Sequence, residues 1–220
     1  MTTQIRNGQK IVFIGDSITD CGRRDSQRPL GNGYVKMFAD LMIIREPAKR
    51  ITIINKGIGG DRVTGMGNLV GLRERWTDDV LRQRPDWLSI MIGINDIGSC
   101  WSNEQATAVT AERYEAAYWD ILKRTRQALP KCRILLVDPF YISQDTASNC
   151  VRKQILDLMP DYLTIVEKLS RTFKTRHIKT HDLFGRLLKY YEPDTFCAEP
   201  VHPNPTGHLV VAEAIYEALR

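Results

Sequence analysis

Short apolar runs alternate with longer amphipathic stretches along this chain. Five runs have the length and composition of buried parallel strands: residues 11–14, 50–55, 87–92, 133–138 and 177–181, the last being the most polar. The stretches between them repeat apolar residues at helical spacing: 34–44, 73–84, 111–129, 153–174 and 205–219. Pro160 is expected to kink or split the fourth of these helices.

Strands that alternate with helices of this length predict a parallel sheet with right-handed crossovers and helices on both faces. We therefore expect a three-layer α/β/α fold whose five strands follow a flavodoxin-like order. A length of 220 residues is typical of one domain, so 1–220 is taken as a single unit. The loops that follow the strands should form the functional edge of the sheet.

Charge, cysteine content and the lengths of the apolar segments argue against several kinds of partner and cofactor. The 31 basic and 26 acidic residues leave a net charge of +5 and form no long run of one sign, so no nucleic-acid partner is expected. Five dispersed cysteines without a C-x-x-C pair indicate neither a zinc site nor a redox motif, and no metal or cofactor is expected. A polar N-terminus and the lack of a long apolar segment predict no membrane partner and a cytoplasmic location.

A serine stands where the first strand should give way to a helix. The segment 10–20 reads K-I-V-F-I-G-D-S-I-T-D, which places Ser17 at the carboxyl edge of the predicted sheet. A serine hydroxyl becomes a useful nucleophile only when a base removes its proton. Alone, the segment favours a simpler interpretation, in which Ser17 or Thr19 caps the helix.

Three later segments carry groups that would complement this hydroxyl. Residues 55–61 hold three glycines after the second strand and let backbone N–H groups approach a ligand, although the segment alone favours a simple tight turn. Asn95 follows the third strand as an amide donor or an Asx-turn residue. Glu199 precedes His202 by three residues, a spacing that suits a base and its orienting carboxylate, or else a helix cap.

The order of the four segments is more specific than any one of them. The motifs G-D-S-I-T-D, N-x-G-x-x-G-D, G-x-N-D and a carboxylate-x-x-His-Pro resemble those of the SGNH hydrolases, also called GDSL-type esterases, over nearly the whole chain. The segments L-G-N-G-Y-V, R-W-x-D-D-V and S-I-M-I-G-I-N-D are most similar to the intracellular carbohydrate acetylesterases, the acetylxylan esterase-like branch.

The resemblance implies a role for each matching position. Ser17 would be the nucleophile and His202 the general base. The oxyanion would be held by the backbone N–H groups of Ser17 and Gly60 and by the side chain of Asn95. The family acid is usually aspartate, and Glu199 takes its place here.

Two positions depart from the family pattern. Glutamate is one methylene longer than aspartate, so Glu199 must bend or its loop must shift to meet the imidazole, and Asp194 is an alternative partner. Ala198 stands where this branch often has a bulky aromatic residue, which leaves the shape of the acyl pocket open.

The expected function is hydrolysis of small acyl esters through an acyl-Ser17 intermediate, with an acetylated sugar or xylo-oligosaccharide as the substrate. Asp16, Trp101 and Tyr141 are assigned to substrate binding; the two aromatic rings would stack on a sugar face or simply pack. A thioesterase or lysophospholipase of the same fold and a non-catalytic carbohydrate-binding relative remain alternatives. A homo-oligomer is left open.

Overall fold

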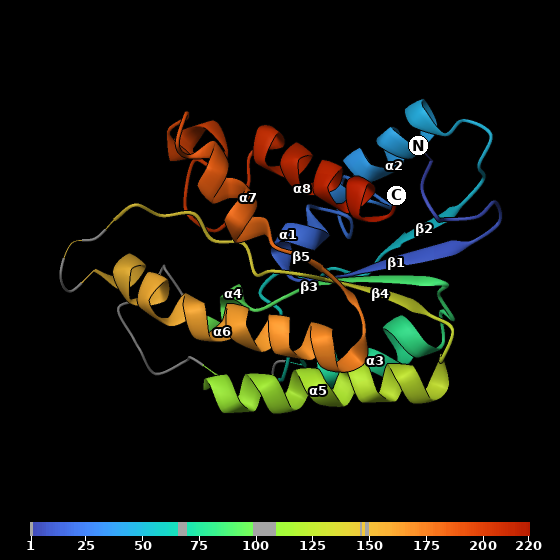
Figure 1. Cartoon of the computed structure of the whole chain (residues 1–220), viewed down its shortest axis with the longest axis horizontal. Coiled ribbons are helices and arrows are strands. Elements are labelled where there is room, and N and C mark those ends of the chain that lie inside the picture. Colours follow the sequence, from blue (N-terminus) through green and yellow to red (C-terminus); the bar gives the residue numbers. More distant parts are fainter. Residues whose placement is uncertain (1, 66–69, 99–108, 146, 148–149) are drawn as a thin grey trace.

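A five-stranded parallel sheet runs through the centre of the molecule (Figure 1). The computed structural model describes residues 2–65, 70–98, 109–145, 147 and 150–220. The strands are β1 (Lys10–Gly15), β2 (Thr52–Asn55), β3 (Trp87–Met91), β4 (Arg133–Val137) and β5 (Arg176–Ile178). Their order, β2-β1-β3-β4-β5 with every neighbour parallel, confirms the predicted flavodoxin-like sheet.

Helices cover both faces of this sheet, as predicted. The helical segments are α1 (Ser17–Asp20), α2 (Tyr34–Arg45), α3 (Leu72–Trp76), η1 (Thr77–Leu81), α4 (Ile94–Ile97), α5 (Ala111–Ala128), α6 (Val151–Phe173), α7 (Thr180–Leu187), η3 (Pro193–Thr195) and α8 (Pro205–Ala218). In Figure 1, α2, α7 and α8 lie on one side of the sheet, and α3, α5 and α6 lie on the other. No helix within the described ranges is both long and apolar enough to cross a bilayer.

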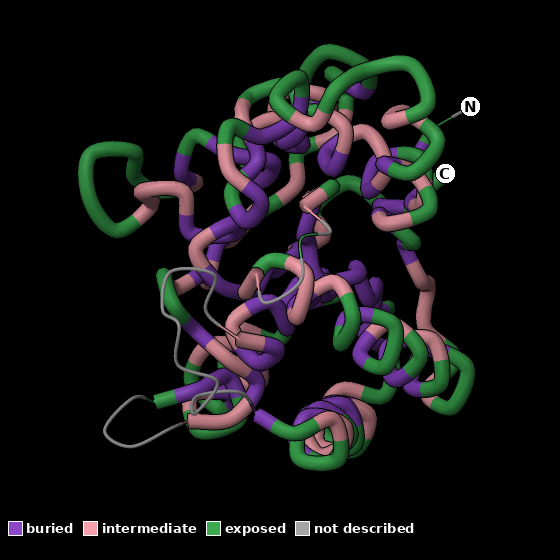
Figure 2. The backbone as a smooth tube through the Cα atoms, turned by 90° about the vertical axis from the view of Figure 1, so that its left-hand side faces the viewer, coloured by how far each residue is buried: buried purple, intermediate pink, exposed green. Residues whose placement is uncertain are grey.

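The core lies between these helices and the central strands (Figure 2). All five residues of β3 are buried, and in β1 only Lys10 is not fully buried. A strand covered by helices on both faces has no solvent side, which explains its continuous apolar run instead of an alternating one. β2 lies at an edge of the sheet and is correspondingly more exposed.

Three segments differ from the sequence prediction. The fifth strand is shorter than expected, because Thr180 and His181 already belong to α7. The helix expected over 73–84 changes from α3 to the π-helical turn η1. Of the two outcomes predicted at Pro160, a kink or a split, the split does not occur, because α6 continues through this residue. Pro160 faces solvent, while Met159 and Tyr162 keep the buried stripe of the helix unbroken.

Ser89 in the middle of β3 predicts a gain in stability on substitution. It is fully buried, and its Oγ has no hydrogen-bond partner among the described residues. An unpaired buried hydroxyl costs free energy, so we expect Ser89→Ala to raise the free energy of unfolding by about 1 kcal/mol. Urea denaturation measures this change.

Thr125 is the matched control, since its hydroxyl is equally buried but bonded. It accepts from Trp76 Nε1 at 2.9 Å and donates to Ile121 O at 2.7 Å. Thr125→Val should lower the free energy of unfolding by about 1–2 kcal/mol because the indole N–H loses its acceptor. Destabilisation by both substitutions would contradict the assignment of Ser89 as unpaired.

Candidate active site

Ser17 is the first residue of α1, immediately after the carboxyl end of β1. Asp16 caps this short helix, because its Oδ1 accepts from the backbone N–H of Ile18 at 2.9 Å. The backbone N–H of Ser17 is left without an acceptor among the described residues, as expected at the start of a helix. The cap therefore fixes both the hydroxyl and a free N–H at this edge of the sheet.

His202 comes from the other end of the chain and contacts Ser17 directly. Its Nε2 lies 2.8 Å from Ser17 Oγ, across 185 positions of sequence. The segment that carries it is held by Asn204, the N-cap of α8, whose Oδ1 accepts from Gly207 N at 3.1 Å. The fold thus pairs an alcohol with an imidazole, which is the arrangement a base-activated nucleophile requires.

Glu199 contacts the opposite nitrogen of this imidazole. Its Oε1 lies 2.5 Å from His202 Nδ1 and accepts from the backbone N–H of His202 at 2.8 Å, while Oε2 accepts from Val201 N at 3.0 Å. The loop curls around the carboxylate, so the longer side chain of glutamate reaches the ring. Asp194 has no such contact; its carbonyl oxygen accepts from Asn204 Nδ2 at 3.1 Å.

Gly60 lies close to Ser17 and offers a second free donor. A Cβ on the preceding residue, Gly59, would lie 3.9 Å from Ser17 Cβ, which places this loop against the hydroxyl. Gly60 has a φ of 77°, a conformation that favours glycine. Among the described residues its N–H has no acceptor. Ser17 and Gly60 therefore both present unpaired N–H groups.

Asn95 completes this group of donors. It lies in α4, after Gly93, whose φ of 141° and a Cβ position only 2.8 Å from Pro139 Cγ require glycine. One N–H of Asn95 Nδ2 donates to Asp61 O at 2.9 Å, which leaves its second N–H available. Since Asp61 follows Gly60 directly, the same loop positions both donors.

Arg75 links the ends of the loops that carry these donors, a role that its place in the sequence does not predict. Its side chain is only 9% exposed. It donates to the Asp61 carboxylate through Nε at 2.8 Å and also through Nη2. It further donates to Lys56 O and Gly15 O at 2.8 and 3.3 Å, and to Asp79 Oδ2 at 2.7 Å. The only signal in the sequence was its place in R-W-x-D-D-V.

Three buried carboxyl groups lie beneath the hydroxyl. Burial raises the pKa of Asp16 to about 7. It raises the pKa of Asp61 to about 6 although the Arg75 guanidinium acts to lower it. Burial also holds the pKa of Asp96 well above its ordinary value, against the hydrogen bond that it accepts from Val63 N. Repulsion from neighbouring carboxylates adds to each shift, from Asp61 on Asp16, from Asp79 on Asp61, and from Asp16 and Asp61 on Asp96.

The structure corrects two of the three predicted substrate-binding residues. Asp16 is 1% exposed and serves as a helix cap. Tyr141 is 3% exposed, and its hydroxyl donates to Arg152 O at 3.2 Å, so its ring packs in the core and has no free face for a sugar. Trp101 lies outside the described residues.

Neither Cys21 nor His208 provides a second nucleophile beside Ser17. Cys21 Sγ lies 3.3 Å from His208 Nε2, and Tyr34 N donates to His208 Nδ1 at 3.3 Å. Burial raises the pKa of the Cys21 thiol to about 12 and lowers the pKa of His208 to about 4, so the thiol stays protonated. Within the described ranges, no three His, Cys, Asp or Glu residues gather as metal ligands.

Comparison with known sequences gives one family and two relatives. A model of the GDSL-like lipase/acylhydrolase family matches residues 13–210. An acetylxylan esterase of Geobacillus stearothermophilus is 34% identical over 218 residues, which cover 96% of this chain and 94% of that protein. The uncharacterized protein YpmR of Bacillus subtilis (strain 168) is 25% identical over 219 residues, 96% of this chain and 81% of its own length.

Solved structures agree with this result. Axe2, an acetylxylan esterase from Geobacillus stearothermophilus, superimposes with a TM-score of 0.82 and is 33% identical, covering 98% of this chain and 96% of its own. An alpha/beta hydrolase from the metagenome of Lake Arreo, Spain, gives a TM-score of 0.81 at 27% identity over the same shares of both chains. The predicted fold class is confirmed.

The raised pKa of Asp16 predicts a loss of stability as the pH rises. Because burial raises its pKa from 3.8 in the unfolded chain to about 7, the folded protein holds this proton more tightly between those values. The contribution of Asp16 is complete below pH 4 and disappears as the pH passes 7. Asp16→Asn keeps the capping oxygen but has no proton to lose. Between pH 4 and pH 8 we expect its free energy of unfolding to rise relative to that of wild type by up to about 4 kcal/mol.

Urea unfolding of the two proteins at a series of pH values measures this difference. Asp145→Asn is the control, because hydrogen bonds from Cys150 and Ala147 lower the pKa of this surface carboxyl. The Asp145→Asn variant should still lose stability between pH 4 and pH 8, as wild type does. A parallel pH dependence for wild type and Asp16→Asn would show that Asp16 does not carry the effect.

Proposed function

This chain belongs to the GDSL-like lipase/acylhydrolase family and is a carboxylic ester hydrolase, and we propose that it removes small acyl groups from acetylated sugars or xylo-oligosaccharides. The observation that carries the mechanism is the continuous contact from Ser17 Oγ through His202 to Glu199, beside unpaired N–H donors. The acetylxylan esterases among its relatives support the choice of an acetyl ester.

In the first step, Ser17 Oγ attacks the ester carbonyl while His202 Nε2 takes its proton. Glu199 keeps Nδ1 protonated, so Nε2 is free to accept, and its charge stabilises the imidazolium that forms. The imidazolium then gives its proton to the departing alcohol. An acyl-Ser17 intermediate and a free hydroxyl compound result.

The tetrahedral intermediate carries a negative oxygen that needs donors. The N–H groups of Ser17 and Gly60 and the free N–H of Asn95 supply them, already oriented before the substrate arrives. Water then attacks the acyl-enzyme, with His202 as the base again, and releases the carboxylic acid. Each proton transfer is between the ester, water, Ser17 and His202.

Replacing Ser17 by alanine tests the proposal. We expect kcat/KM for p-nitrophenyl acetate to fall at least about a thousandfold, since the nucleophile is lost. A fluorophosphonate probe should label the wild type and not Ser17→Ala. The exposed Ser26 gives the control Ser26→Ala, which should keep both the rate and the labelling. Equal rates for wild type and Ser17→Ala would remove Ser17 from the reaction.

A substrate panel separates the acetylesterase from other hydrolases of this fold. Wild type is compared on acetylated methyl xylosides, butyryl esters, acyl-thioesters and lysophospholipids. We expect kcat/KM to be highest for the acetylated xyloside. If kcat/KM is higher for the thioester or the lysophospholipid, the proposed mechanism stands but the proposed substrate is wrong.

A further inference from the structure

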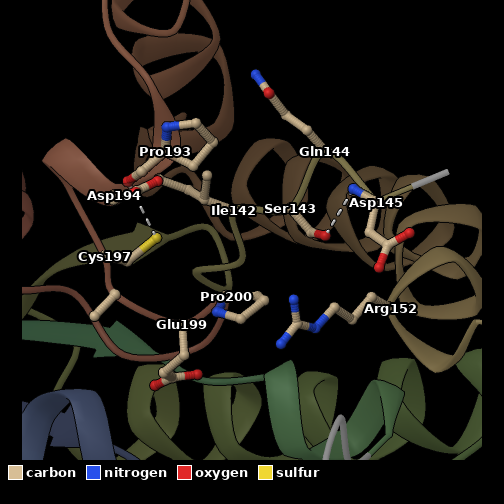
Figure 3. Close-up of a pocket in the computed structure, with 11 residues that line it drawn as sticks. Ile142, Ser143, Gln144, Asp145, Arg152, Pro193, Asp194, Cys197, Glu199 and Pro200 are labelled. Carbon is tan, nitrogen blue, oxygen red and sulfur yellow. Dashed lines mark hydrogen bonds between the residues drawn. The ribbon is translucent and has the colours of Figure 1, made fainter.

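A cavity of about 180 Å³ opens beside Glu199 (Figure 3). One wall follows β4 and contains Ile142, Ser143, Gln144 and Asp145, with Arg152 from the first turn of α6. The other wall is the segment that leads to His202, from Pro193 and Asp194 to Cys197, Ala198, Glu199 and Pro200. The cavity therefore shares a wall with the base and its carboxylate.

The order of the strands places this cavity on the side of the leaving group. The oxyanion donors follow β1, β2 and β3, whereas the cavity lies after β4. The carbonyl oxygen of the ester must face the donors, and the departing alcohol must lie within reach of His202, which returns the proton. The alcohol half of the substrate then extends towards the wall formed by the His202 segment.

The lining suits a neutral molecule with hydroxyl groups. In Figure 3 the Arg152 side chain extends towards Pro200 and Glu199. Among the described residues, the Arg152 guanidinium and the Asp194 carboxylate make no hydrogen bond or ion pair. Charged groups of both signs, the Arg152 guanidinium and the carboxylates of Asp145 and Asp194, favour a ligand that both accepts and donates hydrogen bonds, as sugar hydroxyls do. A hydrocarbon chain would leave these groups facing apolar atoms.

Size and shape agree with a single sugar ring. A cavity of roughly 150 Å³ can hold benzene, so about 180 Å³ holds one six-membered ring and not two. The short side chain of Ala198, with Ile142, Pro193 and Pro200, gives the cavity an apolar surface for the carbon–hydrogen face of such a ring. We propose that this cavity, bounded by Ala198, Arg152 and Asp194, binds the sugar ring that carries the ester; this inference rests on the proposed function.

Filling the cavity tests the proposal. The readout is the ratio of kcat/KM for an acetylated methyl xyloside to kcat/KM for ethyl acetate, whose alcohol is too small to reach the cavity. We expect Ala198→Trp to lower this ratio at least about tenfold and to abolish competitive inhibition by methyl xyloside. Arg152→Met should lower the ratio through a higher KM for the xyloside ester.

Lys153 supplies the matched control. It is the next cation on α6 and pairs with Asp157 at 2.6 Å, away from the cavity, so Lys153→Met should keep the wild-type ratio. An unchanged ratio in both Ala198→Trp and Arg152→Met overturns the sugar subsite. If the wild type hydrolyses neither ester, the proposed function itself fails. Should Ala198→Trp not fold, Arg152→Met and the inhibition by methyl xyloside decide the question.

The contacts of Arg75 independently support a second inference. Its guanidinium reaches Gly15 O, two residues before Ser17, and Lys56 O at the start of the glycine loop. It also holds the Asp61 carboxylate, and Asp61 supplies the carbonyl that orients Asn95. We infer that Arg75 is the positioning residue of the oxyanion hole, acting through Asp61 and without contact with the substrate.

Kinetics separate positioning from mere folding. Arg75→Lys keeps a charge for Asp61 but cannot bond all four acceptors, so kcat for ethyl acetate should fall roughly tenfold to a hundredfold while KM changes by less than about threefold. Arg75→Met should lower kcat further. Affinity for an alkyl boronic acid, whose oxygen occupies the oxyanion position, should fall in step with kcat.

Arg73 is the control on the same helix. It is half exposed and bonds Asp120 Oδ2 at 3.1 Å, so Arg73→Met should keep wild-type kcat and boronate affinity. The folded fraction of each variant is measured by circular dichroism and used to correct kcat. The inference is overturned if the corrected kcat of Arg75→Lys equals that of wild type. It is also overturned if the substitution raises KM and leaves kcat unchanged.

Discussion

A buried guanidinium has to find acceptors, and in this molecule that requirement shapes the candidate active site. Arg75 is almost fully enclosed, and an enclosed charge is tolerated only with good partners on every side. One partner is the carboxylate of Asp61; the others include the carbonyl oxygens of Gly15 and Lys56, at the ends of the first two strands. Satisfying this one group therefore fixes the backbone on which the N–H donors of Ser17 and Gly60 are carried.

The pairing of Ser17 with His202 depends on a longer-range constraint. The parallel sheet brings the ends of β1, β2 and β3 to one edge, and α8 returns the end of the chain to the same region by packing against α2. Asn204 then sets where α8 begins, two residues after His202. Glu199 accepts hydrogen bonds from backbone N–H groups of its own loop as well as from the His202 ring. The loop and the imidazole are therefore ordered together.

The sequence predicts the sheet and the contacting pair well, because both depend on strong local patterns: continuous apolar runs, glycine-rich loops and the Glu199-x-x-His202 spacing. It fails where tertiary packing decides. Tyr141 looks like a free aromatic residue after a strand, but the fold buries its ring. Pro160 predicts a kinked or split helix, but solvent on its side and an intact buried stripe let α6 continue. Arg75 has little local signal, because most of its partners come from two distant segments, the end of β1 and the loop after β2.

The loops around Ser17 contain unpaired N–H groups, a left-handed glycine and a buried carboxyl. The N–H groups of Ser17 and Gly60 have no acceptors among the described residues, Gly60 adopts a left-handed conformation, and Asp16 is a buried carboxyl with a raised pKa. The buried Asp16 carboxyl costs folding free energy, and the tightly packed β1 and β3 nearby offset that cost. A donor already bonded within the protein would be unavailable to a developing oxyanion, so unpaired N–H groups are what the proposed chemistry requires. The Arg75 network keeps them in place without satisfying them.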